Sequence, residues 1–170
     1  MKLASYLFVG AVALGLSACA STPKEAPVTA SSPTASGAKS GGVSPSELEI
    51  RQMQEAMQQL NSKSIFFDYD KFVIKPEYLP LVQQQAELLK RYGKLSVALQ
   101  GNADERGSAE YNLALGQKRA EAVRKALVLL GVPNARLEAV SFGKEKPRAT
   151  CSEERCWSQN RRVDFATKAQ

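Results

Sequence analysis

An aspartate after one predicted strand and an arginine on the next predicted helix are the side chains best suited to hold a charged ligand. Asp104 follows the segment 95–100, whose alternating apolar residues predict a strand. Arg119 lies on or beside the apolar stripe of the predicted helix 109–130. An arginine on that stripe needs partners, because burying an unpaired guanidinium costs several kcal/mol.

Two interpretations of Asp104 and Arg119 are open from the residues alone. They could form a structural salt bridge that orders the loop between them. They could instead form a clamp, in which the carboxylate accepts from an ammonium and the guanidinium donates two parallel hydrogen bonds to a carboxylate. The clamp predicts a ligand with both groups on one carbon, the head of an amino acid. Asn112, two turns before Arg119 on the same helix face, could converge with them.

An enzyme is the alternative to a binding protein. The chain has no histidine, which excludes histidine catalysis and disfavours zinc chemistry. Asp104 and Glu105 are the one close acidic pair of the predicted site, and neighbours on one loop seldom flank a bond from both sides. We therefore expect a non-enzymatic binding site that uses neither a metal nor a cofactor.

The elements that must position these residues alternate along residues 63–168. Apolar patterning predicts strands at 64–68, 95–100, 136–143 and 160–165, and helices at about 76–92 and 109–130. This order, β-α-β-α-β-β, predicts an α/β sandwich with a mixed sheet. Right-handed crossovers would place both long helices on one face of that sheet.

A separate amphipathic helix is predicted before this domain, at residues 47–62. Its apolar residues fall on one side, and Ser46 with Glu49 fits a capping box. A helix of this length is marginal alone, so we expect it to dock on the domain or on a partner.

The first residues of the chain are typical of an exported lipoprotein. Residues 1–18 combine Lys2 with an apolar run too short to span a bilayer comfortably, which indicates a signal peptide. The stretch L-S-A-C resembles a bacterial lipobox, so Cys19 is the expected lipidation site; an ordinary signal peptide with an incidental cysteine is the alternative. Residues 19–46 then predict a disordered tether, since they are Ser-, Thr-, Ala-, Pro- and Gly-rich.

Charge and cysteine content agree with export. Residues 63–170 hold nineteen basic and thirteen acidic side chains, which accounts for the net charge of +6. Because the basic residues are scattered among acids, we expect an anionic wall polymer or lipid surface as the partner and no nucleic acid. Cys151 and Cys156 are an even pair that predicts a disulfide; two free thiols or half a metal site are the alternatives.

The segment GNADERGSAEYNLALGQKRAEAV resembles the signature of the OmpA-like peptidoglycan-binding domain. The helix motif of that family, N-x-x-L-S-x-x-R-A-x-x-V, matches Asn112, Leu115, Arg119 and Val123, with Gly116 in the usual serine position. The stretches FFDYDKFVI, VSFGKEKP and SQNRRVDF resemble the same family in the same order. The resemblance covers nearly all of residues 64–167.

The resemblance implies a ligand and a role for each matched residue. The ligand would be the meso-diaminopimelate side chain of the peptidoglycan stem peptide, whose free end is an amino-acid head. Asp104 would accept from its ammonium and Arg119 would bind its carboxylate. Tyr69 and Asp70 would line the pocket, and Asn112 would contact the ligand or cap the helix. Leu115 and Gly116 would offer backbone groups.

With the lipobox, the resemblance also implies a place in the cell. Acylated Cys19 would anchor the chain in lipid, and alanine at position 20 favours the outer membrane, with the domain in the periplasm. The chain would tether that membrane to peptidoglycan, with TolB and other Tol proteins as partners in envelope integrity and cell division. A wall-anchoring lipoprotein that never meets TolB is the alternative, and a peptidoglycan hydrolase is a more distant one.

Overall fold

The structure is a computed structural model that describes residues 44–170. The predicted signal peptide, Cys19 and the predicted tether up to residue 43 lie outside the described residues. The helices and strands, in chain order, are α1 (Pro45–Asn61), β1 (Ser64–Phe66), the 3-10 helix η1 (Pro76–Tyr78), α2 (Leu79–Arg91), β2 (Leu95–Asn102), α3 (Ala109–Leu129), the 3-10 helix η2 (Asn134–Arg136), β3 (Leu137–Gly143), α4 (Glu154–Asn160) and β4 (Arg162–Ala169).

The four strands form one mixed sheet in the order β1-β4-β2-β3. β4 runs antiparallel to both of its neighbours, whereas β2 and β3 are parallel and are joined through α3. The predicted α/β fold with a mixed sheet is confirmed. The predicted element order was wrong at one place, because α4 separates the last two strands and β4 begins only at Arg162. α4 has seven residues, too few to show a helical period in the sequence.

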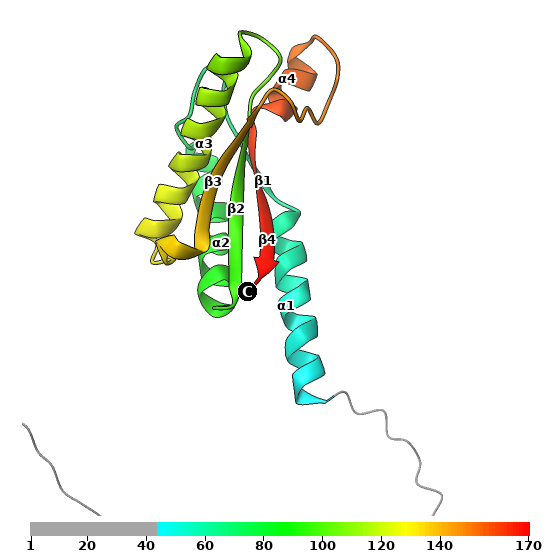
Figure 1. The fold of residues 1–170 in the computed structure, drawn as a ribbon, viewed down its shortest axis with the longest axis vertical. Helices are drawn as coiled ribbons and strands as arrows, with labels where there is room; N and C mark the ends of the chain where they lie inside the picture. Colours follow the sequence, from blue (N-terminus) through cyan, green and yellow to red (C-terminus); the bar gives the residue numbers. More distant parts are fainter. Residues whose placement is uncertain (1–43) are drawn as a thin grey trace, which may run out of the picture. The chain divides into compact units, whose positions relative to one another are not determined.

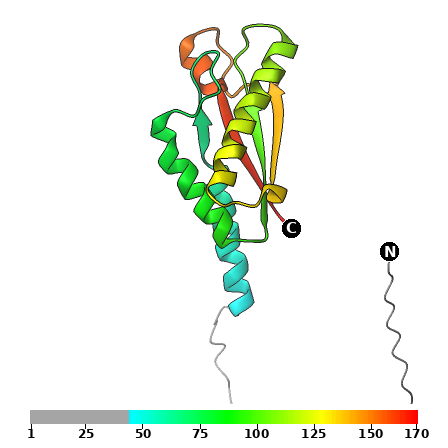
Figure 2. The same cartoon turned by 90° about the vertical axis from the view of Figure 1, so that its left-hand side faces the viewer.

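Helices α2 and α3 cover the same face of the sheet, as predicted (Figures 1 and 2). Apolar side chains from both helices and from all four strands make one buried core, which includes Leu89, Leu99, Val123, Leu137 and Phe165, among others, with Ile65 from the edge strand β1. Pro80 lies in the first turn of α2, where its missing N–H breaks no helical hydrogen bond. The core therefore fixes α3 against β2 and β3, and with it the first turns of α3.

A close approach of two glycines sets the distance between α3 and the sheet. A Cβ added to Gly101 of β2 would lie 1.9 Å from the carbonyl oxygen of Gly116 in α3. A Cβ added to Gly116 would lie 2.9 Å from the carbonyl oxygen of Gly101. No side chain fits between these backbones, so the helix sits closer to the strand here than any other residue pair would allow.

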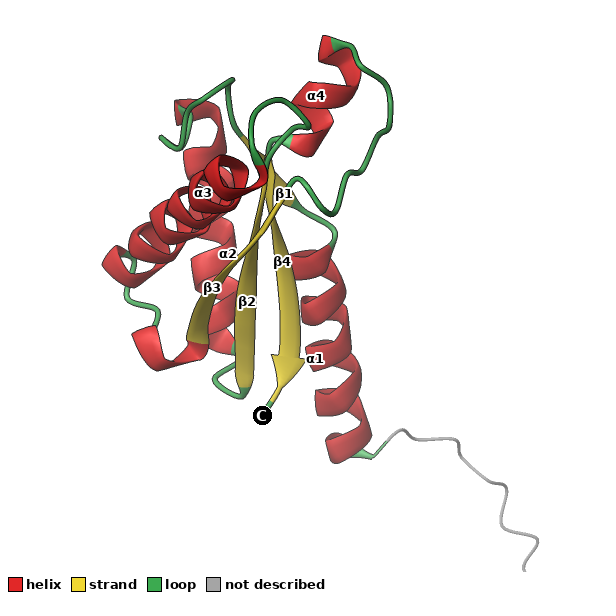
Figure 3. Ribbon diagram, turned by 45° about the horizontal axis from the view of Figure 1, so that its top comes forward, coloured by secondary structure: helices red, strands yellow, loops and turns green. Residues whose placement is uncertain are grey.

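The N-terminal helix α1 packs beside β4, beyond the end of the short strand β1 (Figures 1 and 3). Ala56 and Leu60 of α1 are buried in the core. The side-chain oxygen of Asn61 accepts hydrogen bonds from the backbone N–H of Thr167, at 2.9 Å, and from its hydroxyl, at 2.8 Å. α1 thus docks on the domain and covers an edge of β4 that β1 leaves open.

The start of α1 differs from the prediction. The N-cap is Ser44, whose hydroxyl accepts from the N–H of Glu47 at 3.3 Å, while the Glu47 carboxylate accepts from the N–H of Ser44 at 2.8 Å. The predicted capping box of Ser46 with Glu49 was wrong. Two overlapping boxes are present in the sequence, and the first is used because Pro45 is favourable at the first position of a helix.

Candidate functional site

A small pocket of about 50 Å³ lies where the loops after β1 and β2 meet the first turns of α3. Asp104 and Arg119 both line it, and so do four of the five other residues predicted for the site. The lining residues are Tyr69, Asp70, Asp104, Arg106, Gly107, Tyr111, Asn112, Leu115 and Arg119. Gly116 is the predicted residue that does not line this pocket; it faces β2 in the close approach described above.

Arg119 is fully buried and is held by backbone carbonyls. Its Nε donates to the carbonyl of Lys71 at 2.8 Å, Nη1 to that of Asn102 at 2.8 Å and Nη2 to that of Asp68 at 3.1 Å. A guanidinium has five N–H bonds, so one N–H on each terminal nitrogen is left after these three. Arg119 is therefore fixed by the loop after β1 and the end of β2, and it keeps donors for a further acceptor.

The charge of Arg119 is costly where it lies. Burial, and after it the nearby positive charge of Arg161, lower the pKa of its guanidinium to about 10, although Asp104 and Asp70 act in the opposite direction. A carboxylate brought next to this guanidinium would compensate the charge. The environment of Arg119 is thus suited to an anionic group.

Asp104 forms ion pairs with Arg106 and Arg161, and not with Arg119. Its carboxylate accepts from the Arg106 side chain through Nε at 3.1 Å and Nη2 at 2.6 Å, and from Arg161 through Nη1 at 3.4 Å. Burial raises the pKa of Asp104, but the hydrogen bonds from Arg106 outweigh this, so that the pKa lies below its usual value. Within residues 44–170 no ion pair joins Asp104 to Arg119, so the simple structural salt bridge is not formed.

Side chains from four segments, the loops after β1 and β2, α3 and α4, close the mouth of the pocket. The guanidinium of Arg106 lies between two aromatic rings, 4.0 Å from the centroid of Tyr69 and 4.0 Å from that of Trp157. The hydroxyl of Tyr111 in the first turn of α3 donates to the carboxylate of Asp70. Asp70 has a positive φ of 56°, a left-handed conformation that few residues other than glycine adopt easily.

Asn112 orders the loop rather than the helix end. Its amide nitrogen donates to the carbonyl of Arg106 at 2.8 Å, and only 2% of Asn112 is exposed. Ser108 is the N-cap of α3, with its hydroxyl accepting from the N–H of Tyr111 at 3.2 Å. The sequence left two interpretations of Asn112, a ligand contact and a helix cap. The cap is excluded because Ser108 holds that position. The hydrogen bond to the loop is a third role, which the sequence analysis did not consider.

Sequence patterns missed three members of the site. Arg106, Tyr111 and Arg161 lie on loops or in the first turn of a helix, where no periodicity marks a buried contact. Arg161 is 5% exposed and links the carbonyl of Phe67 at 3.0 Å to Asp104. A signal for it existed in the pair Arg161–Arg162 next to a buried strand, because adjacent arginines at a strand start need acidic or carbonyl partners.

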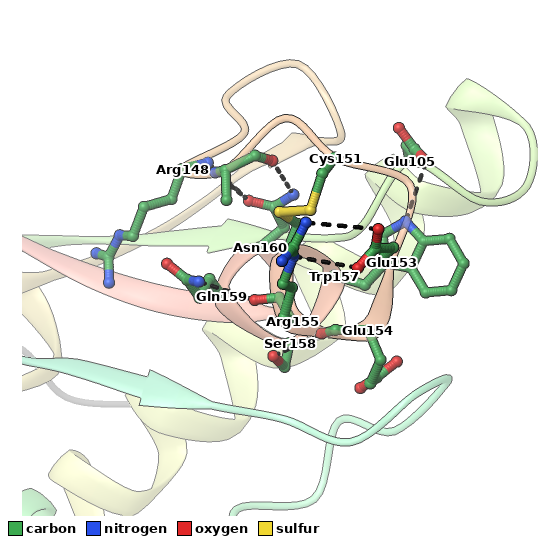
Figure 4. Close-up of a disulfide and its surroundings, with 12 residues drawn as sticks. Glu105, Arg148, Cys151, Glu153, Glu154, Arg155, Trp157, Ser158, Gln159 and Asn160 are labelled. Carbon is green, nitrogen blue, oxygen red and sulfur yellow. Dashed lines mark hydrogen bonds and ion pairs between the residues drawn. A yellow bond between two sulfur atoms is a disulfide. The ribbon is translucent and has the colours of Figure 1, made fainter.

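The predicted disulfide is confirmed. Cys151 and Cys156 are bonded, with their Cα atoms 5.5 Å apart, and the bond closes the loop at the start of α4 (Figure 4). The side chain of Asn160 holds the preceding backbone, accepting from the N–H of Arg148 at 2.7 Å and of Ala149 at 3.0 Å. The alternatives of free thiols or a metal half-site are thereby excluded.

Two negative findings hold for the part of the chain that the structure describes. None of the helices in residues 44–170 has the length and apolarity needed to cross a membrane. The same residues contain no group of three or more carboxylate or cysteine side chains that could hold a metal ion.

The chain belongs to the OmpA family, whose model matches residues 66–161. The peptidoglycan-associated lipoprotein of Brucella melitensis is 48% identical over 99 residues, and that of Pseudomonas putida is 49% identical over 102 residues. These matches cover 58% and 60% of this chain and 59% and 61% of those proteins, less than two thirds of their length.

Solved structures agree with this membership. The peptidoglycan-associated lipoprotein of Burkholderia pseudomallei has 53% identity and a TM-score of 0.63, covering 65% of this chain and 93% of that one. The C-terminal domain of Helicobacter pylori MotB has a TM-score of 0.60 over 64% of this chain and 85% of that one. At 19% identity, MotB shows likeness of fold alone.

Proposed function

We propose that this chain is a non-enzymatic lipoprotein that binds peptidoglycan through the pocket between Asp104 and Arg119. The observation that carries the proposal is the environment of Arg119. Its guanidinium is buried and charged and donates to three backbone carbonyls. Two of its N–H groups have no protein acceptor among the described residues, and the carboxylates of Asp70 and Asp104 line the same pocket. Its membership of the OmpA family and its likeness to proteins named peptidoglycan-associated lipoprotein support the wall polymer as the ligand.

The ligand group that suits this pocket is the amino-acid head of meso-diaminopimelate. Its carboxylate would accept from the remaining N–H groups on the two terminal nitrogens of Arg119. Its ammonium would donate to Asp104, and Asp70 would provide a second carboxylate at the same mouth. Leu115 would offer an apolar wall, and Tyr69 and Tyr111 would cover the ligand from outside.

The pocket must open for this ligand to enter. Its volume of about 50 Å³ has no room for an amino-acid head while Arg106 and the Tyr111–Asp70 hydrogen bond close it. Arg106 is half-buried, and Asp70 and Tyr111 are exposed, so these three side chains can turn aside without unpacking the core. The buried part of the site, Arg119 and its three carbonyls, can stay in place.

No chemistry is required of the site. Asp104 carries a carboxylate with a lowered pKa, and a general acid needs the opposite shift. A lowered pKa keeps the carboxylate charged, which suits recognition of an ammonium. A hydrolase is therefore the less favoured function.

Anchoring in the outer membrane through acylated Cys19 completes the proposal. A lipid anchor and a wall-binding domain on one chain would tether the two layers, and confinement near the wall would let a modest affinity suffice. Partnership with TolB and other Tol proteins, in envelope integrity and cell division, is proposed on the resemblance alone. Co-purification of TolB with the chain would distinguish this role from anchoring without TolB.

A pulldown with purified sacculi tests the wall contact. The full chain in detergent should co-sediment with sacculi, and free meso-diaminopimelate should compete. Loss of one charge-assisted contact in Arg119→Lys should weaken binding roughly 10- to 100-fold. Arg124→Lys is a matched control, since Arg124 lies on the same helix and pairs with Glu121 outside the pocket. Release of soluble muropeptides would instead favour the hydrolase.

A further inference from the structure

The disulfide-closed loop and α4 lie directly against the pocket. Trp157 follows Cys156, and its ring is one of the two aromatic faces that hold the guanidinium of Arg106. The indole N–H of Trp157 donates to Glu105 at 3.0 Å, which ties α4 to the loop after β2 (Figure 4). Cys156 of the disulfide is thus one residue away from the ring that stacks on Arg106, the side chain bonded to Asp104.

A second connection joins α4 to Asp104, through Glu154 and Arg161. Glu154 lies between the two cysteines and accepts from the guanidinium of Arg161, which also donates to Asp104 at 3.4 Å. Both arginines that bind Asp104 are therefore held from the segment 151–157, Arg106 by stacking and Arg161 by an ion pair. The ring of Tyr69 and the carbonyl of Phe67 also hold these two arginines, so the segment 151–157 provides one of two supports for each.

We propose that the Cys151–Cys156 disulfide and Trp157 are positioning elements that hold Arg106 closed over Asp104, so that the redox state of this pair sets the affinity for the ligand ammonium. The inference rests on the proposed function, because it concerns access to the same carboxylate. Arg106 donates two side-chain hydrogen bonds to Asp104 in the ligand-free protein, at 3.1 and 2.6 Å. An incoming ammonium competes with those bonds, and whatever fixes Arg106 opposes binding.

Reduction acts on the pair through ordinary thiol–disulfide exchange. A dithiol reductant supplies two electrons and two protons, the bond between the two cysteine sulfurs breaks, and the reductant becomes a cyclic disulfide. Cys151 is partly exposed, so a thiolate can reach its sulfur. Once the disulfide is broken, the short helix α4 loses its covalent closure, and the hydrogen bond to Glu105 is left to hold the ring of Trp157 near Arg106.

Trp157 reports on this change, since it is the only tryptophan of the 170 residues. We expect reduction to shift the emission of the full chain in detergent and to tighten binding of meso-diaminopimelate about two- to fivefold, the weight of one cation–π contact. Cys151→Ser combined with Cys156→Ser should reproduce the reduced state and should not respond to the reductant.

Two variants separate positioning by the indole from general stability of the loop. In a competition pulldown with sacculi, Trp157→Phe keeps an aromatic face over Arg106 and should bind as the oxidised parent does. Trp157→Ala should show the two- to fivefold gain of the reduced protein. A merely structural role predicts the same effect for both substitutions, or weaker binding for both.

The outcomes distinguish this inference from the proposed function. If the oxidised parent binds neither sacculi nor meso-diaminopimelate, both the proposed function and the inference are overturned. If the oxidised parent binds, and reduction leaves its emission and affinity unchanged or weakens binding, only the inference is overturned.

Discussion

Asp104 and Arg119 line one pocket, yet each is satisfied by different groups. Asp104 is bound by Arg106 and Arg161, whereas Arg119 donates to three backbone carbonyls. Opposite charges are thus kept close without neutralising each other, which is what recognition of a zwitterionic head requires. A direct salt bridge would have used up the donors of Arg119 that the ligand carboxylate needs, whereas on Asp104 the ligand ammonium competes with Arg106.

Arg119 should be as important for stability as for binding. Arg119→Ala leaves the carbonyls of Lys71, Asn102 and Asp68 without donors in a buried place, so the free energy of unfolding should fall by about 3 kcal/mol or more. Urea unfolding followed by circular dichroism measures this. Arg119→Lys should lower the free energy of unfolding by less, because the lysine ammonium can still donate hydrogen bonds to some of the three carbonyls. Equal stability of the alanine variant and the parent would contradict the contacts described.

The two glycines between α3 and β2 should differ in their tolerance of a methyl group. Gly101→Ala would place Cβ 1.9 Å from the backbone of Gly116, so the helix must move and about 3 kcal/mol of stability should be lost. Gly116→Ala would place Cβ 2.3 Å from the hydroxyl of Ser141, which can turn aside, and 2.9 Å from the carbonyl oxygen of Gly101, a milder backbone contact, and should cost about 1–2 kcal/mol. Gly93→Ala, with no atom within 4 Å, is the control and should be near neutral. The reverse order in thermal unfolding would refute the close approach.

Asp104 should make the domain sensitive to acid in a defined window. Its folded pKa lies below that of the unfolded chain, so its contribution is present above about pH 4 and is lost as the pH falls through the folded pKa. At pH 7, Asp104→Asn should therefore be less stable by about 2 kcal/mol, since charge-assisted bonds from two arginines are lost. The difference between variant and parent should shrink below pH 4, which urea unfolding at several pH values can follow. If the difference in the free energy of unfolding between parent and variant grew as the pH fell, the lowered pKa of Asp104 would be contradicted.

Asp70 should show its backbone strain. Its φ of 56° is tolerated by asparagine better than by alanine, so Asp70→Ala should be about 1 kcal/mol less stable than Asp70→Asn. The amide oxygen of asparagine can still accept from Tyr111 and alanine cannot, so both substitutions are compared in a Tyr111→Phe background, which lacks that hydrogen bond. Thermal unfolding of the two proteins provides the comparison, and equal stabilities would argue against the left-handed conformation.

Local patterns were sufficient to predict most of the fold and the centre of the site. The apolar stripe of α3 placed Arg119 against the sheet, and the alternation of residues 95–100 placed Asp104 at a strand end. Both predictions rest on periodicity within one element, which a sequence displays directly. The core followed from the same patterns, whereas the placement of α2 and α3 on one face followed from the right-handed crossover rule.

The closure of the site could not be predicted in that way. Arg106 and Trp157 meet from loops or short elements 51 positions apart in the chain, and neither position has a periodic neighbour that would mark it. α4 is a helix of seven residues, stabilised by its tertiary contacts and its disulfide rather than by its own pattern. The start of α1 depended on a choice between two capping boxes that differ by the position of Pro45.

Binding to sacculi is the most direct test of the clamp. The full chain should co-sediment with sacculi and be displaced by free meso-diaminopimelate, and Asp104→Asn and Arg119→Lys should each bind at least tenfold more weakly while remaining folded at the assay temperature. Arg124→Lys should bind as the parent does. The opposite result is that both pocket variants are folded and still sediment with sacculi as fully as the parent does. That result would contradict recognition of an amino-acid head by Asp104 and Arg119.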